Sequence, residues 1–428
     1  MTEAVSRRHA IGMAGAAAAA ALLPAPVIAK GAVPQVVVIG GGVGGATLAR
    51  QLALGAPGKI FVTLIEPART YRTCFLSNLT IAGLHGGLSI DHDYTRLVYE
   101  LGILVIHDRA QSVDLAARNV KLASGQTVPY DRLVISPGVD FKFDAIEGYD
   151  AAAAELMPHA WRRDQPIEVL KARIDAMPEG GVFAIAAPAI PYRCPPGPYE
   201  RASMVAHLLK RQNPRAKILI IDEKESFTKQ QLFLDGWNRH YPGMIEWLPL
   251  KEHGGLKAVS AKTGELQCEV RSFRVDAANV IPPQRAGQIA AEAGLSDASG
   301  WCPIEAQTML SAIDRNVHVL GDSSRAESMP KSAESAASQA RLAANAIMRE
   351  MDNSEAPKDR IANTCWSLIG EDDGVKIGST FEPSGAKFTS TSNYISVVGE
   401  HPSVRRRTAG ELLEWYQFVT SEMFGGAA

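Results

Sequence analysis

The feature that most constrains the fold is a glycine-rich turn placed between a strand and a helix. Residues 35–39 read Gln-Val-Val-Val-Ile, and such a β-branched run without alternation is typical of a strand buried on both faces of a parallel sheet. The spacing Gly-x-Gly-x-x-Gly follows at 40–45, residues 46–54 favour a helix, and 60–65 form a second strand-like run. This order predicts a βαβ unit, and therefore an α/β protein that begins with a Rossmann-like domain.

The glycine turn predicts a dinucleotide site. Gly40 permits a tight turn, Gly42 leaves room for a pyrophosphate, Gly45 allows close helix–strand packing, and Gly44 lies within the same turn. The N–H groups and the macrodipole at the start of the helix would bind the pyrophosphate. Glu66 ends the second strand about twenty residues later, where an acid bonds the ribose hydroxyls. The alternative, a purely structural glycine turn, does not account for the strand, the helix and Glu66 together.

Three observations favour FAD over NAD at this site. The motif lies near the start of the chain, which suits flavoproteins with two dinucleotide-type domains. Gly321 and Asp322 end a late strand, where an Asp can bind the ribityl chain, although a plain strand-end turn is the alternative. Lys331 precedes a predicted helix at 332–351, whose N-terminus could stabilise negative charge on a reduced flavin. Gly138, at the end of another strand-like run, also belongs to the predicted cofactor-binding residues.

The second α/β unit lacks the corresponding glycine motif. Strand-like runs at 182–186 and 217–222 predict this unit, but the turn at 186–191 reads Ala-Ala-Pro-Ala-Ile-Pro. Prolines remove backbone N–H donors, and Cβ atoms would crowd a pyrophosphate. We therefore expect no nicotinamide cofactor, and the electrons must leave by another route.

These elements predict two Rossmann-like domains of the glutathione-reductase type, followed by a small C-terminal α+β domain with a helix at 409–423. A linker is expected near 352–357. The predicted boundaries are a signal peptide at 1–30, an FAD-binding domain in two parts at 31–145 and 286–352, a second Rossmann-like domain at 146–285, and the C-terminal domain at 353–428.

The first residues predict an export signal. Arg7 and Arg8 precede an Ala-rich apolar run at 10–23, and the segment closes on small residues at Ala29. The paired arginines favour the twin-arginine route over the Sec route and indicate a periplasmic location, whereas an ordinary amphipathic helix would show a polar face. A formal net charge of -2 argues against a partner such as nucleic acid.

Cysteines carry the remaining chemistry. No Cys-x-x-Cys pair occurs, so neither a zinc site nor a haem attachment site is predicted. Cys194 lies in a loop that four prolines stiffen, and the adjacent Arg193 favours its thiolate. The chain has five cysteines in total: Cys74, Cys194, Cys268, Cys302 and Cys365.

These residues resemble those of the flavoprotein subunit of flavocytochrome c sulfide dehydrogenase. The resemblance implies FAD bound covalently through a thioether to Cys74, a redox-active disulfide between Cys194 and Cys365, an acidic Glu200 beside the pair, and Trp415 near the flavin. Val43 and Arg72 depart from the family's pattern, which leaves the loops around the flavin less determined. The resemblance covers essentially the whole mature chain, and its most specific segments are 40–45, 71–78, 192–203, 300–303, 321–322, 329–339 and 363–367.

The same resemblance implies an oxidoreductase that oxidises sulfide and passes the electrons to a c-type cytochrome subunit. A sulfide:quinone oxidoreductase, which would share the cysteine pair, is an alternative. Such an enzyme would contact the membrane through the apolar C-terminal helix and the arginines at 405–407. Packing of that helix on the flavin domain is the favoured interpretation. A flavoprotein accessory to another sulfur-oxidising complex is a second alternative, and an NAD-linked disulfide reductase is disfavoured by the turn at 186–191. Without the resemblance, Cys74 could be a buried thiol. Cys194 and Cys365 could form a purely structural disulfide, and Glu200 could be a salt-bridge partner.

Overall fold

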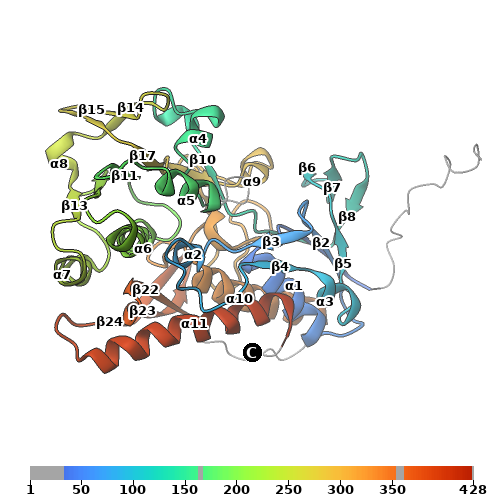
Figure 1. Ribbon diagram of the computed structural model, residues 1–428. Helices are drawn as coiled ribbons and strands as arrows, with labels where there is room; N and C mark the ends of the chain where they lie inside the picture. The colour runs from blue at the N-terminus through green and yellow to red at the C-terminus, as the bar shows by residue number, and fades with distance from the viewer. Residues whose placement is uncertain (1–32, 162–166, 353–360, 427–428) are drawn as a thin grey trace, which may run out of the picture.

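The computed structural model describes residues 33–161, 167–352 and 361–426. The predicted signal peptide and most of the predicted linker lie outside these ranges. Two parallel sheets form the centre of the molecule, and a C-terminal unit packs beneath them (Figure 1). The α/β class with a disulfide-reductase-like fold and a separate C-terminal domain, predicted from the sequence, is confirmed.

The first sheet has five strands in the order β20-β9-β1-β2-β5, all parallel. Its central strand is the predicted β-branched run, and the side chains from Val36 to Val38 are at most 1% exposed. The late strand predicted to end at Gly321 and Asp322 belongs to this sheet, but it ends earlier, at Val319. The strands are β1 (Gln35–Ile39), β2 (Phe61–Ile65), β5 (Leu104–Ile106), β9 (Arg132–Ile135) and β20 (Val317–Val319).

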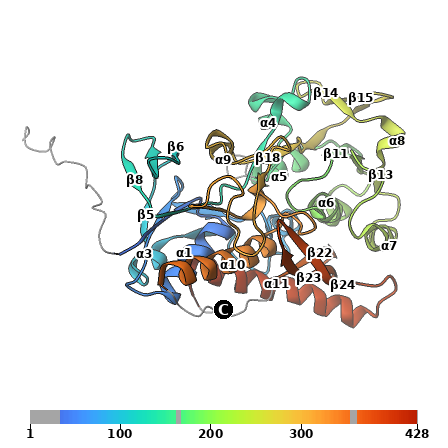
Figure 2. The ribbon, with the colours of Figure 1, turned by 180° about the vertical axis from the view of Figure 1, so that it is seen from behind.

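Helices and small antiparallel sheets surround this first sheet. Helix α1 (Val43–Gly55) packs along α10 (Ala333–Asp352), and Figure 2 shows the pair side by side from behind. Smaller elements extend the domain: β3 (Thr70–Arg72), α2 (Ser77–Ala82), β4 (Asp91–Asp93), α3 (Thr95–Tyr99), β6 (Ala110–Asp114), β7 (Asn119–Leu122), β8 (Thr127–Pro129), η1 (Phe143–Ala145), α9 (Gln288–Glu292), β19 (Cys302–Pro303), η2 (Gly321–Ser323) and β21 (Ser324–Arg325).

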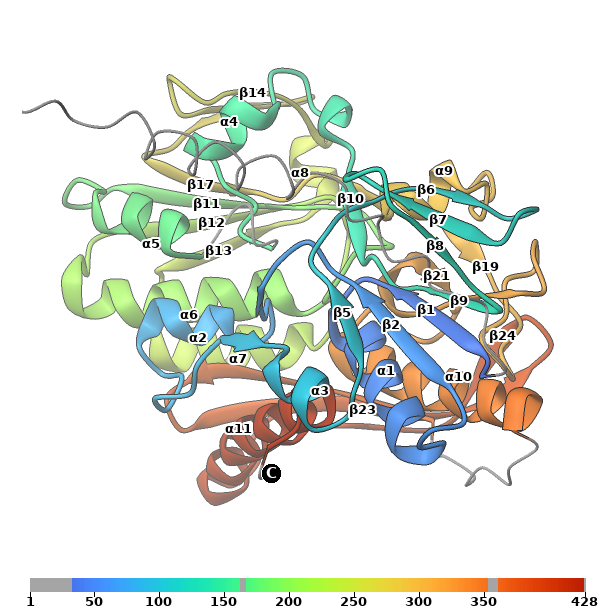
Figure 3. The same ribbon diagram turned by 90° about the vertical axis from the view of Figure 1, so that its right-hand side faces the viewer.

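The second sheet has the order β13-β12-β11-β17 and is also parallel. Figure 3 shows it beside the first sheet, and the antiparallel strands β10 (Val139–Phe141) and β18 (Gln284–Ala286) join the two domains. The elements of this domain are α4 (Ala151–Leu156), α5 (Ile167–Asp175), β11 (Val182–Ala187), α6 (Gly197–Gln212), β12 (Lys217–Asp222), α7 (Gln230–His240), β13 (Ile245–Leu248), α8 (Leu250–His253), β14 (Leu256–Ser260), β15 (Glu265–Cys268), β16 (Ser272–Arg274) and β17 (Ala277–Val280).

The C-terminal unit is an antiparallel sheet covered by one long helix. Strands β22 (Ala362–Gly370), β23 (Asp373–Ser384) and β24 (Lys387–Ile395) precede α11 (Pro402–Phe424). The predicted helix start at 409 is wrong. Pro402 occupies the first turn, His401 caps it by accepting from the N–H of Ser403, and the buried Arg405 pairs with Asp373 at 2.5 Å.

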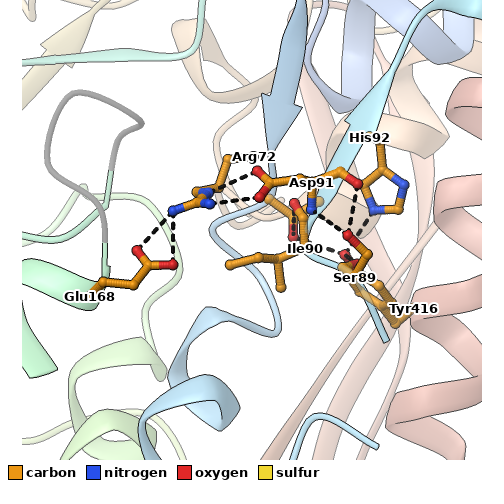
Figure 4. A network of polar contacts seen from close by, with 8 residues as sticks. Arg72, Ser89, Ile90, Asp91, His92, Glu168 and Tyr416 are labelled. Carbon is orange, nitrogen blue, oxygen red and sulfur yellow. Dashed lines mark hydrogen bonds and ion pairs between the residues drawn. The ribbon is translucent and has the colours of Figure 1, made fainter. Parts of the chain in front are cut away.

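Helix α11 buries its apolar face. The side chains of Tyr416, Val419 and Met423 are at most 1% exposed, and the hydroxyl of Tyr416 donates to the carbonyl of Ser89 at 2.7 Å (Figure 4). Among the described residues, no helix combines the length and the apolar character that a membrane crossing requires.

Candidate active site

The turn between β1 and α1 leaves no room for side chains at the predicted glycines. Gly40 has φ +99°, and a Cβ there would lie 2.4 Å from the carbonyl oxygen of Ser136. A Cβ on Gly45 would lie 1.9 Å from the carbonyl oxygen of Gly40, and one on Gly44 would lie 2.3 Å from Leu320. The glycines therefore allow the helix, the turn and the neighbouring strands to approach closely.

The start of α1 is available to an anion. Gly42 is the N-cap residue and supplies no side-chain cap. Glu66, which follows β2, accepts from the N–H of Gly41 and from that of Ala68, both at 2.9 Å. The predicted Glu66 carboxylate therefore lies directly beside the glycine turn.

Asp322 lies at the end of the first sheet with one oxygen paired and one unpaired. Its Oδ2 accepts from Nε of Arg193 at 2.6 Å, while its Oδ1 is buried without a hydrogen-bond partner among the described residues. Gly138 faces this ion pair, because a Cβ there would lie 2.5 Å from the Arg193 guanidinium. A buried carboxylate oxygen without a donor is unfavourable, so it fits the hydroxyl groups of a flavin side chain. This oxygen, the uncapped α1 and the glycine turn together fit FAD.

Lys331 holds the segment that carries Asp322. Its ammonium donates to the carbonyls of Asp322 and Ser324, both at 2.8 Å, and lies 3.6 Å from the ring centre of Trp301. Burial lowers the pKa of Lys331 to about 8. The side chain of the predicted Lys331 thus contacts the backbone of η2 and β21 and an indole ring.

The loop of Cys194 is joined to the strand of Cys365 through the start of α10. The N–H of Cys194 donates to the carbonyl of Lys331 at 2.7 Å. The next residue, Ser332, donates to Oδ1 of Asn363 at 2.5 Å, and Nδ2 of Asn363 lies 3.4 Å from Sγ of Cys365. Two cysteines that are far apart in sequence therefore belong to one cluster.

Both sulfurs of this cluster are partly buried. Cys194 adopts φ +56°, a left-handed conformation that is uncommon for a residue other than glycine. Burial raises the pKa of both thiols, and the negative charge of Cys365 raises that of Cys194 further. The structure describes all five cysteines as free thiols.

Glu200 lies in the first turn of α6 beside the cysteines. Its carboxylate accepts from Nδ2 of Asn78 at 2.8 Å and from the N–H of Leu368 at 2.9 Å. Burial raises its pKa, and these two hydrogen bonds act in the opposite sense. Glu200 therefore connects α2, α6 and β22 through the hydrogen bonds of its carboxylate.

Cys74 lies between β3 and α2, near the pair of Arg193 and Asp322. Burial raises the pKa of its thiol, and the Arg193 charge opposes that effect. The neighbouring Phe75 packs against Trp415 with ring centres 5.6 Å apart. Trp415 also stacks on Trp366, the residue after Cys365, at 5.4 Å. The predicted Trp415 thus joins Phe75, the residue after Cys74, and Trp366, the residue after Cys365, in one aromatic cluster.

Sequence reasoning missed several polar residues around the cysteines. Lys229 is buried beside Cys365, and Arg201 is fully buried with its guanidinium bonded to Asn78 and Asn279. No motif marks either residue, since each depends on packing between elements distant in sequence. Among the described residues, no group of three or more His, Cys, Asp or Glu side chains could hold a metal ion.

Fold and site together define a flavoprotein of the pyridine nucleotide-disulphide oxidoreductase type. Residues 34–169 match the family model of that description. The sulfide:quinone oxidoreductase of Aquifex aeolicus has a similar fold, with TM-score 0.71 and 18% identity over 92% of this chain and 93% of that one. A ferredoxin reductase from Rhodopseudomonas palustris has TM-score 0.62 and 18% identity over 82% and 84%.

Two further family models match later parts of the chain. Residues 167–282 match the sulfide dehydrogenase (flavocytochrome c) flavoprotein chain, central, and residues 357–424 match flavocytochrome c sulphide dehydrogenase, flavin-binding. The chain belongs to the family of flavoprotein chains of flavocytochrome c sulfide dehydrogenase, whose cofactor is FAD.

Two curated relatives match parts of the chain. The mitochondrial sulfide:quinone oxidoreductase of Mus musculus is 22% identical over 67% of this chain, and the sulfide-quinone reductase of Aquifex aeolicus is 30% identical over 43% of it. The matched region spans 65% of the length of the first relative and 41% of that of the second.

Proposed function

We propose that this protein oxidises sulfide at a Cys194–Cys365 disulfide and transfers the electrons through FAD to a c-type cytochrome. The observation that carries this proposal is the junction of the two cysteine segments at Lys331 and Asn363, next to Asp322 of the FAD site. The family assignment supports sulfide as the substrate and a cytochrome as the partner.

The first chemical step is thiol–disulfide exchange with an inorganic thiol. Hydrosulfide attacks one sulfur of the pair, a new S–S bond forms to the attacking sulfur, and the Sγ–Sγ bond breaks. The electron pair of the broken bond remains on the other cysteine as a thiolate, and the attacked cysteine carries a persulfide. Glu200, whose pKa burial raises, accepts or returns the proton of these sulfur species.

Different residues of the chain would hold different parts of the cofactor. FAD, when bound, supplies acceptance of two electrons and their release one at a time. The start of α1 would hold its pyrophosphate, Glu66 a ribose, and Oδ1 of Asp322 a hydroxyl of the side chain. Trp415 packs against Phe75 and Trp366, which follow Cys74 and Cys365 in the sequence.

A thioether between Cys74 and the flavin completes the proposal for the cofactor. Its support is the family resemblance together with the burial of Cys74 beside the Arg193–Asp322 pair. A covalent link would keep FAD bound after export by the twin-arginine route to the periplasm, which the residues before Ala29 favour. Acid denaturation tests the link, because flavin absorbance should stay with the wild-type chain and separate from the Cys74→Ala variant.

The decisive experiment adds sulfide to the purified protein and follows the flavin absorption band. Anaerobic bleaching, followed by reduction of cytochrome c on mixing, is the expected result. Reduction of a quinone in place of cytochrome c would identify the acceptor of the quinone-linked relatives instead. A flavin band that sulfide does not change would overturn the proposed function.

A further inference from the structure

A buried lysine lies next to the cysteine pair without a role in the chemistry described so far. Lys229 immediately precedes α7, has φ +65° and is only 4% exposed. Its ammonium donates to the carbonyl of Cys365 at 3.0 Å and to the hydroxyl of Ser367 at 2.7 Å. These bonds hold the cation against the segment of β22 that carries the second cysteine.

Among the residues that the structure describes, Lys229 has no direct counter-ion, because no carboxylate forms an ion pair with its nitrogen. Both of its described hydrogen-bond acceptors are neutral. An isolated buried ammonium is costly unless an anion compensates it. Ammonium groups carry three N–H donors, and the described hydrogen bonds of Lys229 use two.

The anionic groups around Lys229 are sulfurs and one carboxylate. Burial lowers the pKa of Lys229 to about 8, whereas negative charge on Cys365, then Glu200, then Cys194 raises it. Glu200 already accepts from Asn78 and the N–H of Leu368. Cys365 is thus the anion for which the lysine is most directly placed.

We propose that Lys229 stabilises the negative charge that Cys365 acquires when the sulfur pair is reduced. The inference rests on the proposed function for its chemistry. When the disulfide opens, Cys365 bears either the thiolate that receives the electron pair of the broken bond or the anionic persulfide formed by attack. Both species place one negative charge on the same side chain, so one cation serves either direction of attack. Lys229 therefore acts as a positioning residue through the backbone carbonyl and as an electrostatic partner of the sulfur.

Several elements contribute to the field at Cys365. Burial raises the pKa of the Cys365 thiol, and the charge of Glu334 on α10 raises it further. The charge of Lys229 and hydrogen bonding to Asn363 and Ser332 lower this pKa. Glu200 on α6 and Arg405 on α11 act on the lysine with opposite signs. Loss of the lysine should therefore shift the ionisation of Cys365 without abolishing the other donors.

The test measures the pH dependence of thiol alkylation in the reduced, FAD-containing protein. Iodoacetamide labels both cysteines, and peptide mass spectrometry resolves the rate at each one. Lys229→Met should raise the midpoint for Cys365 by about one pH unit, which is a tenfold slower reaction below the midpoint. Lys229→Arg should restore the wild-type midpoint, and Ser367→Ala, which removes one of the two bonds, should give a smaller shift in the same direction.

Lys224→Met is the matched control. Lys224 is also largely buried, but it forms an ion pair with Asp222. Its loss should leave the Cys365 midpoint unchanged. An unchanged midpoint in both Lys229→Met and Ser367→Ala, or an equal shift in Lys224→Met, would overturn the inference. Because the measurement uses neither sulfide nor cytochrome, a protein that sulfide cannot reduce would end the proposed function while the lysine shift still stood.

Discussion

The two parallel sheets of this protein end in very different turns. In the first domain, β1 ends at Ile39 and α1 begins at Val43, with only glycines between them. In the second, β11 ends at Ala187 and α6 begins only at Gly197. The short turn has room for a dinucleotide, whereas the long proline-rich loop carries Cys194. One topology thus provides a cofactor cradle in one domain and a sulfur-bearing loop in the other.

The difference has a simple physical cause. A pyrophosphate needs free N–H groups at a helix start and no side chains around them. The first turn of α6 contains Pro198 and follows Pro196, neither of which has an N–H to donate. Glu200 in that turn would also repel an anion. The second domain therefore uses its helix start to hold an acid and a cysteine.

The largest expected effect comes from the cysteine loop. Cys194→Ser should abolish sulfide-dependent flavin reduction, by about 10³-fold or more, because serine cannot form or open a disulfide. FAD content should remain that of the wild type, since the flavin cradle lies in the other domain. Stopped-flow absorbance with sulfide measures the rate, and Cys268→Ser in β15 is the control. A turnover near the wild-type value would contradict the assigned role of the loop.

The reciprocal change is made in the glycine turn. Gly45→Ala places a methyl group 1.9 Å from the Gly40 carbonyl, so the turn must open. We expect FAD to be lost and the free energy of unfolding to fall by about 3 kcal/mol or more. Gly410→Ala in α11, where nothing lies within 4 Å, should keep both. Flavin-to-protein absorbance and denaturant unfolding distinguish the variants, and full FAD content in Gly45→Ala would refute the comparison.

The two regions also differed in how much the sequence could reveal. The glycine turn and Glu66 lie close together in sequence, and their geometry is local, so the motif predicted it. The segments of Cys194 and Cys365 are linked only through tertiary packing, and only the family resemblance paired the two cysteines. The early start of α11 followed from burial of Arg405 against Asp373, a contact that no local pattern contains. Lys229 is buried because the start of α7 packs against β22, and no sequence pattern predicts that contact.

An intermediate effect is expected at the acid that connects the loop to the C-terminal domain. Glu200→Gln should slow sulfide oxidation about 10²-fold and remove one limb of its pH profile, because an amide cannot carry the proton. Rate measurements from pH 5 to 9 check this. A profile with the same shape as that of the wild type would show that Glu200 does not titrate in the reaction.

Stability should depend on the same group in a defined direction. Since burial raises the folded-state pKa of Glu200, the folded protein binds this proton more tightly than the unfolded chain does. Its contribution is therefore most favourable at low pH and is lost as the pH rises from the ordinary value through the raised one. As the pH rises through this window, the unfolding free energy of the wild type should therefore fall relative to that of Glu200→Gln. Chemical denaturation at the two ends of the window measures it.

The smallest effect is expected where the two domains are joined at the surface. The guanidinium of Arg72 bonds Asp91 on β4 and, at 2.8 and 2.9 Å, both carboxylate oxygens of Glu168 on α5 (Figure 4). Arg72 is 27% and Glu168 53% exposed, so solvent screens the pair. Glu168→Ala should lower the free energy of unfolding by about 0.5 kcal/mol, and less at high salt.

A double-mutant cycle with Arg72→Ala isolates this cross-domain pair from the Arg72–Asp91 contact within the first domain. A coupling free energy well above about 1 kcal/mol that salt does not reduce would contradict a solvent-screened contact. In that case the relative position of the glycine turn and the cysteine loop would depend on this arginine. The glycine turn and the cysteine loop would then be coupled through Arg72, and loss of Arg72 should also slow flavin reduction by sulfide.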